Sequence, residues 1–501
     1  MPAQVTTRAQ VNGYRFLIRR LEHALIRGDS RMIHDPMRGQ MRALIVGVII
    51  AVLITGASAV MAFFKPSPNL GDAQILLSKS SGAAFVRIGD RVHPVLNLAS
   101  ARLIVGKNES PKEADDKFLN VLPRGPMVGI IGAPTSIRGA DNLATSSWTV
   151  CDTLQTPGVT ETTGAASLQT TVLANEAVVD GNSREAEPAE AILTEVSGTT
   201  YLIYDGVRAP IDLSNPVLVN GLHLQDASAR PVSLGLLNTF PLVDPITPVT
   251  IDGVGEPSPA LGPDYPVGSM VKTVDSRGEQ LYVVLRDGLQ AVSPATADII
   301  RYGESDAARA SAREIAPAML AQVPIVHLLP VEHYPSVPPQ IVPPDPDRVV
   351  CMGWQRSNTA AEATVRLLVG HQLPVPDGAQ TVRLATGDGN GPGVDFVYLT
   401  PGAGEYVQAT GGGPGSDSTG QLFYVSDTGL RYHIKDFPTA DALGVTGVKV
   451  PDGPQNGPQW APWPVLSLLP PGPELSQEAA LVAHDGMAAD PGSVAIQPPE
   501  N

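Results

Sequence analysis

The sequence contains few side chains whose types and spacing could perform chemistry. No G-x-S-x-G, H-E-x-x-H or C-x-x-C arrangement occurs, so the usual signatures of nucleophilic and zinc-dependent hydrolysis are missing. His327 and His333 lie in a proline-rich stretch that cannot present a regular ligand face. Asp388 and Asn390 have a calcium-like spacing without the closing Glu of an EF-hand, which favours a glycine-rich turn. We therefore expect no catalytic residue and no metal site.

Two glycine-containing stretches invite comparison with a phosphate-binding loop. Such a loop needs G-x-x-x-x-G-K-[ST], whose backbone amides cradle phosphates while Lys and Ser/Thr reach the terminal phosphates and magnesium. "VGKNES" around Gly106 lacks the first glycine and has Asn after the lysine, and "TGGGPGSDSTG" from Thr410 has no lysine. Both read more simply as turns. The sequence therefore assigns no nucleotide-binding residue and predicts no cofactor.

The two cysteines, Cys151 and Cys351, have similar surroundings. "SSWTVCDT" and "DRVVCMGW" each read as a short β-strand with a Trp three residues from the Cys. If joined, they would close a loop of about 200 residues and stabilise the fold by roughly 5 kcal/mol in the chain-entropy model. The alternative is two buried thiols that never meet. Thiol catalysis is disfavoured, because neither cysteine has a neighbouring His or Lys to lower its pKa.

An uncharged run of 22 residues, Ala43 to Phe64, predicts a membrane-spanning helix. At about 1.5 Å per residue it would extend roughly 33 Å, close to the ~30 Å hydrocarbon thickness of a bilayer. Ala57-Ser58-Ala59 resembles a signal-peptidase site. However, the apolar run continues past it and a long leader precedes the run, which favours a retained span over a cleaved signal peptide. A helix of a soluble core would not need this length.

Charge and periodicity describe the leader before this run. Residues 1–42 carry eight arginines and three acidic residues, a net charge of +5, in a chain of net charge −16. The positive-inside rule then places the N-terminus in the cytoplasm and the large C-terminal part outside. Apolar residues recur at helical spacing with arginines on the other side, so the helix could lie on lipid or dock onto a partner. The predicted docking residues are Tyr14, Leu17, Ile18, Leu21, Arg19 and Arg20.

Four stretches of the exported part share one pattern, and they begin at Leu76, Leu193, Val271 and Leu422. Each has an apolar strand, a turn glycine and an aromatic residue that opens a second strand. The glycines are Gly82, Gly198, Gly278 and Gly429, and the aromatics are Phe85, Tyr201, Tyr282 and Tyr432. The pattern predicts a β-hairpin followed by a short helix. We expect the aromatics to fill the repeats' own cores; the alternative is that Tyr201, Tyr282 or Tyr432 contacts cell-wall glycan.

The unequal spacing of the four copies excludes a solenoid with one fixed period. The expected fold is α+β: an amphipathic N-terminal helix, one transmembrane helix and an elongated, pseudo-symmetric exported body with a β-rich central domain and four small repeats. The predicted boundaries are 1–42 for the leader, 43–64 for the span, 70–118, 188–255, 262–314 and 396–475 for the repeats, 119–187 and 315–395 for the central domain, and 476–501 for a disordered tail. The acidic balance argues against a nucleic-acid partner.

Taken together, the motifs resemble the EccB family, the membrane component of mycobacterial type VII (ESX) secretion systems. The resemblance covers about residues 6–490 and the leader is most similar to the ESX-1 type. It rests on "TTRAQVNGYRFLIRRLEHALIRGD", the single span, "RVHPVLNLASARLIVG", "RGPMVGIIGAP", "SSWTVCDT" and "APWPVLSLLPPGPELSQEAAL". It implies a disulfide-tied central domain with four related repeats. It also implies assembly with the EccC motor ATPase, the EccD subunit and EccE in the inner membrane.

The family is also described as an ATP hydrolase, which would make ATP a cofactor. This sequence departs from that description, because it has no P-loop and only a short segment before the span. The expected function is a self-associating structural component of the secretion complex without enzymatic activity. The alternatives are an ATPase subunit and a cell-wall-binding module.

Overall fold

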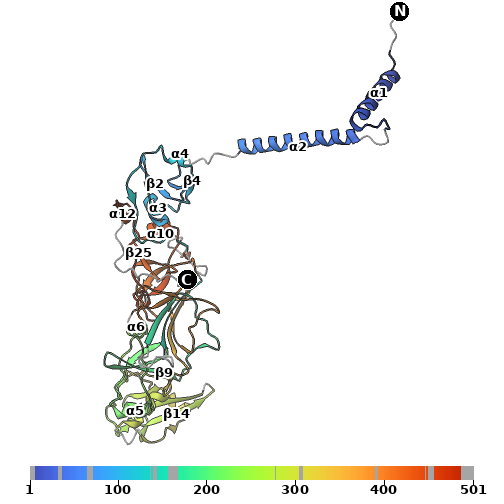
Figure 1. Ribbon diagram of the computed structural model, residues 1–501. Coiled ribbons are helices and arrows are strands. Elements are labelled where there is room, and N and C mark those ends of the chain that lie inside the picture. Colours follow the sequence, from blue (N-terminus) through green and yellow to red (C-terminus); the bar gives the residue numbers. More distant parts are fainter. Residues whose placement is uncertain are drawn as a thin grey trace, which may run out of the picture. The chain divides into compact units, whose positions relative to one another are not determined.

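The computed structural model describes residues 6–31, 36–64, 72–135, 137–138, 144–155, 167–276, 278–303, 309–389, 393–445, 447–449 and 456–486. The chain divides into two compact units, Met1–Gly71 and Asp72–Asn501. Their elements are labelled in Figure 1. Each unit is described by itself below.

The first unit consists of two helices, α1 (Arg8–Arg27) and α2 (Pro36–Phe64). Helix α1 begins where the Gln10 side chain accepts a hydrogen bond from the Thr7 N–H (3.0 Å) and ends at Gly28, whose φ of 68° suits a left-handed cap. Helix α2 contains the predicted span and begins seven residues before it. The leader helix and the apolar helix are therefore both present.

The second unit contains four four-stranded sheets that share one topology. In each sheet three strands form an antiparallel meander, and the fourth strand pairs in parallel with the first, which gives the order 3-2-1-4. A short helix follows the third strand. The four predicted hairpin-and-helix repeats are therefore confirmed, and each is larger than one hairpin.

The elements of the repeats are as follows. Repeat 1 contains β1 (Ile75–Ser78), β2 (Ala84–Ile88), β3 (Arg91–Pro94), α3 (Leu98–Val105) and β4 (Lys112–Ala114). Repeat 2 contains β9 (Glu190–Val196), β10 (Thr199–Tyr204), β11 (Val207–Pro210), α5 (Pro216–Gly221) and β18 (Gln340–Ile341). Repeat 3 contains β14 (Met270–Asp275), β15 (Gly278–Leu285), β16 (Gly288–Val292), α7 (Pro294–Tyr302) and β17 (Arg313–Glu314), with the small hairpin β12 (Pro257–Ser258) and β13 (Gly262–Pro266) before it. Repeat 4 contains β23 (Glu405–Thr410), β24 (Leu422–Val425), β25 (Arg431–Ile434), α10 (Phe437–Leu443) and β26 (Gln459–Pro462).

The predicted hairpin of repeat 4 is present, but it is the second hairpin of its sheet and not the first. In repeats 1 to 3 the predicted turn glycine lies between the first and second strands, whereas Gly429 lies between the second and third, β24 and β25. Tyr432 accordingly lies on the third strand. In repeats 1 to 3 both turns contain or adjoin a glycine, whereas residues 411–421 form a long connection between the first two strands of repeat 4. The only short glycine turn of repeat 4 among the described residues is therefore the second one. The four glycines do adopt positive φ, as such turns require, at 68°, 78°, 121° and 85°.

Every repeat continues after its first helix, past the expected boundary in repeats 1 and 3 and within the expected bounds in repeats 2 and 4. A second short helix precedes a segment that pairs in parallel with the third strand through isolated bridges. In all four repeats a proline carbonyl in this segment accepts a hydrogen bond from a backbone N–H of the third strand, at 2.9 to 3.1 Å. These helices are α4 (Asp116–Leu119), α6 (Leu234–Thr239), α9 (Pro317–Leu320) and α11 (Trp463–Leu466), and the prolines are Pro123, Pro241, Pro324 and Pro470.

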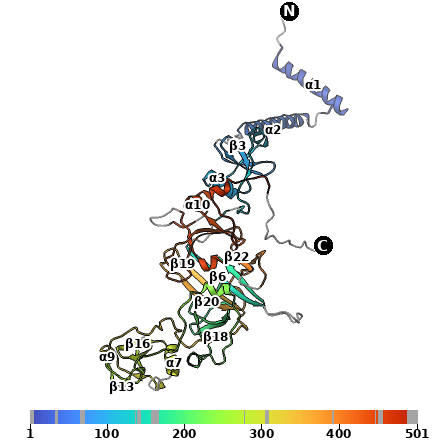
Figure 2. The same ribbon diagram turned by 90° about the vertical axis from the view of Figure 1, so that its left-hand side faces the viewer.

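A seven-stranded sheet forms the centre of the second unit, in the order β21-β22-β7-β6-β19-β20-β8. Figure 2 shows β6, β19, β20 and β22 in this region. The bounds are β6 (Thr145–Gln155), β7 (Ser167–Leu173), β8 (Ser183–Glu185), β19 (Val349–Ser357), β20 (Thr364–Gly370), β21 (Val382–Arg383) and β22 (Phe396–Tyr398). Six of these strands come from the two segments predicted to form the central domain, 119–187 and 315–395, whereas β22 lies in the segment that was assigned to repeat 4.

The hydrophobic cores join the repeats in pairs. Repeats 1 and 4 share one core, in which α3 lies against α10, and repeats 2 and 3 share another, in which α5 lies against α7. A third core buries residues of the central sheet together with residues of repeats 2 and 4. One repeat of each pair is therefore fixed to the central sheet.

The sequence pattern predicted a disordered tail over 476–501, but residues 476–486 are ordered. They form α12 (Gln477–Ala480) and β27 (Ala483–His484), which pairs with β5 (Met127–Val128). His484 Nε2 lies 2.8 Å from the Gly129 carbonyl oxygen. Apolar burial explains the order, because Ala480 belongs to the core of repeats 1 and 4. Residues 487–501 lie outside the described part.

Candidate functional site

The predicted docking residues lie on one exposed helix, α1. Tyr14, Leu17 and Leu21 are each at least 60% exposed, and Ile18 is 39% exposed. Residues three and four apart lie on the same face of a helix, so these side chains form one apolar stripe. Arg19 and Arg20 lie on the other side by the same geometry. A stripe of this size is costly to leave in water, which suits a docking or lipid-facing surface.

Helix α2 has the composition of a membrane span. The segment Gly39–Met61 is long and apolar enough to cross a bilayer, and none of it is buried inside the protein. Its apolar residues surround the helix instead of following one face, as expected of a helix in lipid. The predicted limits Ala43 and Phe64 both lie on α2.

A disulfide joins Cys151 and Cys351 at the centre of the body. The two residues are direct partners in the antiparallel ladder between β6 and β19, with Sγ atoms 2.08 Å apart and Cα atoms 4.0 Å apart. The two tryptophans of the cysteine strands, Trp148 and Trp354, are also register partners and are almost fully buried. The similarity of the two cysteine segments therefore reflects neighbouring strands of one sheet.

Next to this bridge, Asp152 connects the central sheet to repeat 2. Its side chain is 2% exposed and accepts hydrogen bonds from Thr170 Oγ1 (2.7 Å), from the Ser233 N–H (2.6 Å) and from Ser233 Oγ (3.0 Å). Ser233 is the N-cap of α6 and also accepts from the Leu236 N–H. Burial raises the pKa of Asp152 to about 6, against the effect of its three donors and of Arg230. These hydrogen bonds join β6 of the central sheet to the start of α6.

Arg230 is the buried cation nearest to this network. Its side chain is 4% exposed, and Nε and Nη1 have no hydrogen-bond partner. Burial lowers its pKa to about 10, while Asp347 and Asp152 oppose that shift. Its N–H donates to the Leu193 carbonyl (2.9 Å), which places residue 230 beside the first strand of repeat 2. The charges of Asp347 and Asp152 therefore oppose the cost of burying Arg230 beside repeat 2.

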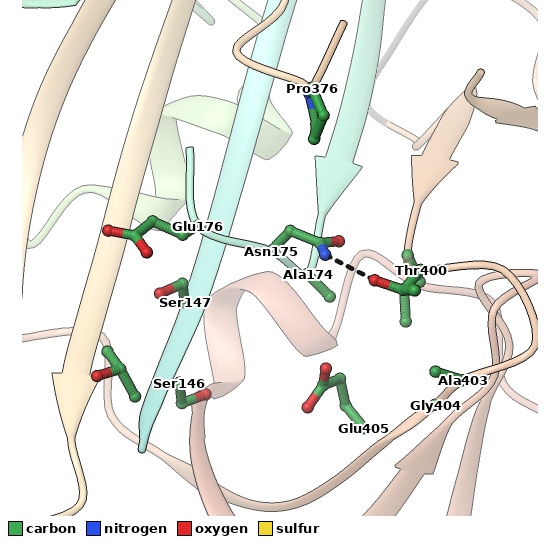
Figure 3. A pocket seen from close by; sticks show the side chains of 12 residues that line it. Ser146, Ser147, Ala174, Asn175, Glu176, Pro376, Thr400, Ala403, Gly404 and Glu405 are labelled. Atoms are coloured by element: carbon green, nitrogen blue, oxygen red, sulfur yellow. Dashed lines mark hydrogen bonds between the residues drawn. The ribbon is translucent and has the colours of Figure 1, made fainter. Parts of the chain in front are cut away.

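A pocket lies between the central sheet and repeat 4 (Figure 3). Its volume is about 270 Å³. Its lining comes from the start of β6, from the ends of β7 and β22, from the start of β23 and from the connection between β20 and β21. The lining residues are Thr145, Ser146, Ser147, Ala174, Asn175, Glu176, Pro376, Leu399, Thr400, Ala403, Gly404 and Glu405. The lining contains two carboxylates, one carboxamide and several hydroxyls, but no cationic side chain.

Glu405 and Asn175 supply unpartnered acceptors in this pocket. The Glu405 carboxylate points from β23 into the pocket, and Asn175 and Thr400 lie on another side of it (Figure 3). Asn175 Nδ2 donates to Thr400 Oγ1 (3.0 Å), but Asn175 Oδ1 is buried without a hydrogen-bond partner. Burial raises the pKa of Glu405 to about 7. Sequence patterns give no signal for this pocket, because its residues come from four distant segments.

The stretches compared with phosphate-binding loops are turns. Gly106 caps α3 with a φ of 72°, and its N–H donates to the Arg102 carbonyl (2.8 Å). In the other stretch the Gly411 N–H donates to the hydroxyls of Ser416 and Ser418, within the connection between β23 and β24. Both glycine-rich segments therefore use their backbone amides to close turns.

The His, Asp and Asn residues that were considered for a metal site do not lie together in the described part of the chain. Within the described residues, no three or more His, Cys, Asp or Glu side chains are grouped as a metal site would require. His327 lies 3.9 Å from Glu332, whereas His333 packs edge-on against Tyr334. Asp388 lies within the described residues and Asn390 lies outside them.

The repeat aromatics mostly fill cores. Phe85 and Tyr432 are buried, and Tyr201 packs against the core of the central sheet with the guanidinium of Arg208 5.6 Å from its ring centroid. Tyr282 packs against a small core of repeat 3. These contacts favour the packing interpretation over a glycan-binding role for Tyr201, Tyr282 and Tyr432.

Comparisons with known proteins cover nearly the whole chain. Residues 3–489 match the family model described as "Type VII secretion system ESX-1, transport TM domain B". The chain is 39% identical to the ESX-3 secretion system ATPase EccB3 of Mycobacterium tuberculosis, over 97% of this chain and 90% of that protein. It is 33% identical to the ESX-1 secretion system ATPase EccB1 of the same species, over 98% of this chain and 97% of that protein.

Solved structures agree with these matches. A chain of an intact ESX-5 inner membrane complex aligns with a TM-score of 0.69 at 31% identity, over 99% of both chains. A chain of the EccB3 dimer from the ESX-3 core complex aligns with a TM-score of 0.67 at 33% identity, over 82% of this chain and 100% of that one. By family model, sequence and fold, this chain belongs to the EccB family of type VII secretion systems.

Proposed function

We propose that the chain is a structural subunit of an ESX inner membrane complex that anchors and connects the export machinery without hydrolysing ATP. One observation carries the proposal: a fully exposed apolar helix, α2, separates an arginine-rich amphipathic helix from a large disulfide-containing body. The arginines favour a cytoplasmic N-terminus, and a disulfide persists in an oxidising compartment such as the periplasm. The body would then face the periplasm.

The proposed partners are a second copy of this chain and the EccC, EccD and EccE subunits. Relatives of known structure are an ESX-5 inner membrane complex chain and an EccB3 dimer, which supports assembly and self-association. The apolar stripe of α1 is the surface proposed for cytosolic contacts, since it has exposed apolar side chains at helical spacing. Energy for transport would come from a partner, because the glycine-rich segments of this chain are engaged in turns.

The docking role is tested by changing the stripe in the full-length chain. Leu17→Glu with Leu21→Glu places two charges on the stripe, and Asn12→Glu provides a matched control on the opposite face of α1. We expect the double variant to stay in the membrane fraction but to lose co-purification of the other subunits, while the control retains it. Full co-purification with the double variant would refute docking through this stripe.

The proposed topology is tested separately by protease treatment of intact spheroplasts. We expect the body to be digested from outside and the residues before α2 to be protected. Protection of the body would place it in the cytoplasm and contradict the proposal.

A further inference from the structure

The pocket between the central sheet and repeat 4 has a chemistry that the scaffold role does not use. Its acceptors lack partners: the Glu405 side chain makes no hydrogen bond or ion pair with the described residues, and Asn175 Oδ1 is buried unpaired. Buried polar groups are normally satisfied, and an unpaired one is costly. Of the two acceptors, Asn175 Oδ1 is fully buried, whereas the Glu405 carboxylate is partly buried and open to the pocket. A ligand with several donors would bind both.

The lining also selects the charge and shape of such a ligand. Glu176 adds a second carboxylate at the exposed side, and Ser146 and Thr400 add hydroxyls, whereas no Lys, Arg or His among the described residues lines the pocket. The other walls are apolar, notably Pro376 and Leu399. A cationic donor group on an aliphatic stem matches both surfaces, because the stem can pack against the apolar wall while the head reaches the carboxylate.

We propose that this pocket binds the ammonium group of a primary alkylamine, with Glu405 as its ion-pair partner and Asn175 Oδ1 as a further acceptor. The three N–H donors of the ammonium match the carboxylate, the carboxamide oxygen and a hydroxyl of the lining. The amine can be a lysine side chain of a partner protein or a free alkylamine. The volume of about 270 Å³ accommodates an alkylammonium of this size.

The test is calorimetric titration of the purified full-length chain with n-butylammonium at pH 8, with n-butanol as the uncharged control. We expect n-butylammonium to bind and n-butanol not to bind. Glu405→Gln keeps the shape of the side chain and should weaken binding by roughly 10- to 100-fold, as expected for loss of a charge-assisted hydrogen bond. Glu113→Gln changes an exposed carboxylate on β4 and is the matched control, with no effect expected.

The pH dependence gives a second readout. Below the pKa of Glu405, affinity should fall by about tenfold per pH unit, because the carboxylate must lose its proton to pair with the ammonium. The other titratable groups facing it are Glu176 in the lining and the Tyr424 hydroxyl, whose pKa burial raises to about 12. Tyr424 therefore stays protonated across this range, and Glu176→Gln measures the contribution of the outer carboxylate.

Three outcomes would overturn the proposal: equal binding of n-butanol and n-butylammonium, unchanged binding in Glu405→Gln, or preferential binding of Ca²⁺. The source of the amine is distinguished in the assembled complex. If a partner lysine occupies the pocket, the complex should not bind added n-butylammonium although the isolated chain does. If the occupant is a free amine, both should bind it. Neither result depends on α1 docking, so failure of this proposal is distinguishable from failure of the scaffold role.

Discussion

Removing the disulfide should destabilise the second unit, Asp72–Asn501, by several kcal/mol without changing its fold. Cys151→Ala with Cys351→Ala opens a loop defined by a sequence separation of 200 residues. In the chain-entropy model a loop of this length contributes about 5 kcal/mol, mainly by restricting the unfolded chain. The strands that carry the cysteines remain paired from Val349↔Thr153 to Ser357↔Thr145, so the folded sheet should persist.

The natural tryptophans provide the assay. Trp148 and Trp354 lie opposite each other three residues from the bridge and are nearly inaccessible, so their emission should change when this sheet opens. Trp460 and Trp463 of repeat 4 also contribute to the fluorescence, so the signal reports unfolding of the sheet together with that repeat. In urea titrations of the full-length chain we expect the variant to unfold at a lower midpoint. We also expect a steeper transition, because the uncrosslinked denatured state exposes more surface.

Reduced wild-type protein is the control that separates the bridge from the substitutions. It should unfold at nearly the same midpoint as the double alanine variant. Equal midpoints for oxidised wild type, reduced wild type and variant would refute the argument, because the loop closure would then contribute nothing to stability.

Three further perturbations probe other contacts of the body by denaturant unfolding of the full-length chain. Asp152→Asn should lower the free energy of unfolding by about 2–4 kcal/mol, because an amide cannot accept from all three donors of the buried network. A loss below about 0.5 kcal/mol would show that the network does not stabilise the fold. Glu405 has a folded-state pKa of about 7, above its unfolded value, so the folded protein retains a proton and its stability should fall as pH rises from about 4.5 to 7. Glu405→Gln should remove that slope and be more stable than wild type by about 2 kcal/mol at pH 8, after allowance for partial exposure; identical pH profiles would refute it. Gly206→Ala should lower the free energy of unfolding more than Gly198→Ala. Both glycines have positive φ, but only at Gly206 would an added Cβ meet the Val365 carbonyl oxygen, at 2.3 Å. Equal losses would show that the backbone at Val365 moves away without cost.

The local elements of this protein follow directly from its sequence. The uncharged run from Ala43 predicts α2, because the rise per residue of a helix and the thickness of a bilayer together set the length of a spanning helix. The hairpins of repeats 1 to 3 follow from apolar strands around Gly82, Gly198 and Gly278, since glycine accepts positive φ without steric cost. The similar surroundings of the cysteines also predicted related strands. In each case the signal lies within a few neighbouring residues.

Other features depend on residues that are distant in the chain. The fourth strand and the proline-containing segment of each repeat pair in parallel with earlier strands, and such pairing leaves little periodic signal in two or three residues. Residues 476–486 look like a polar tail but are ordered by contact with repeat 1. In repeat 4, only the pairing of β24 with both β23 and β25 shows that the predicted hairpin is the second one of the sheet.

The sequence by itself determined that this chain has an amphipathic leader, one apolar span and a repeated β-rich body, because each depends on local periodicity and composition. Only the tertiary structure decided the pairing of the repeats, the opposition of Cys151 and Cys351 in one ladder, and the pocket around Glu405. The environment of Glu405 illustrates the physical reason. Burial raises its pKa, and that burial is created by segments up to 260 residues away, such as the start of β6 at Thr145.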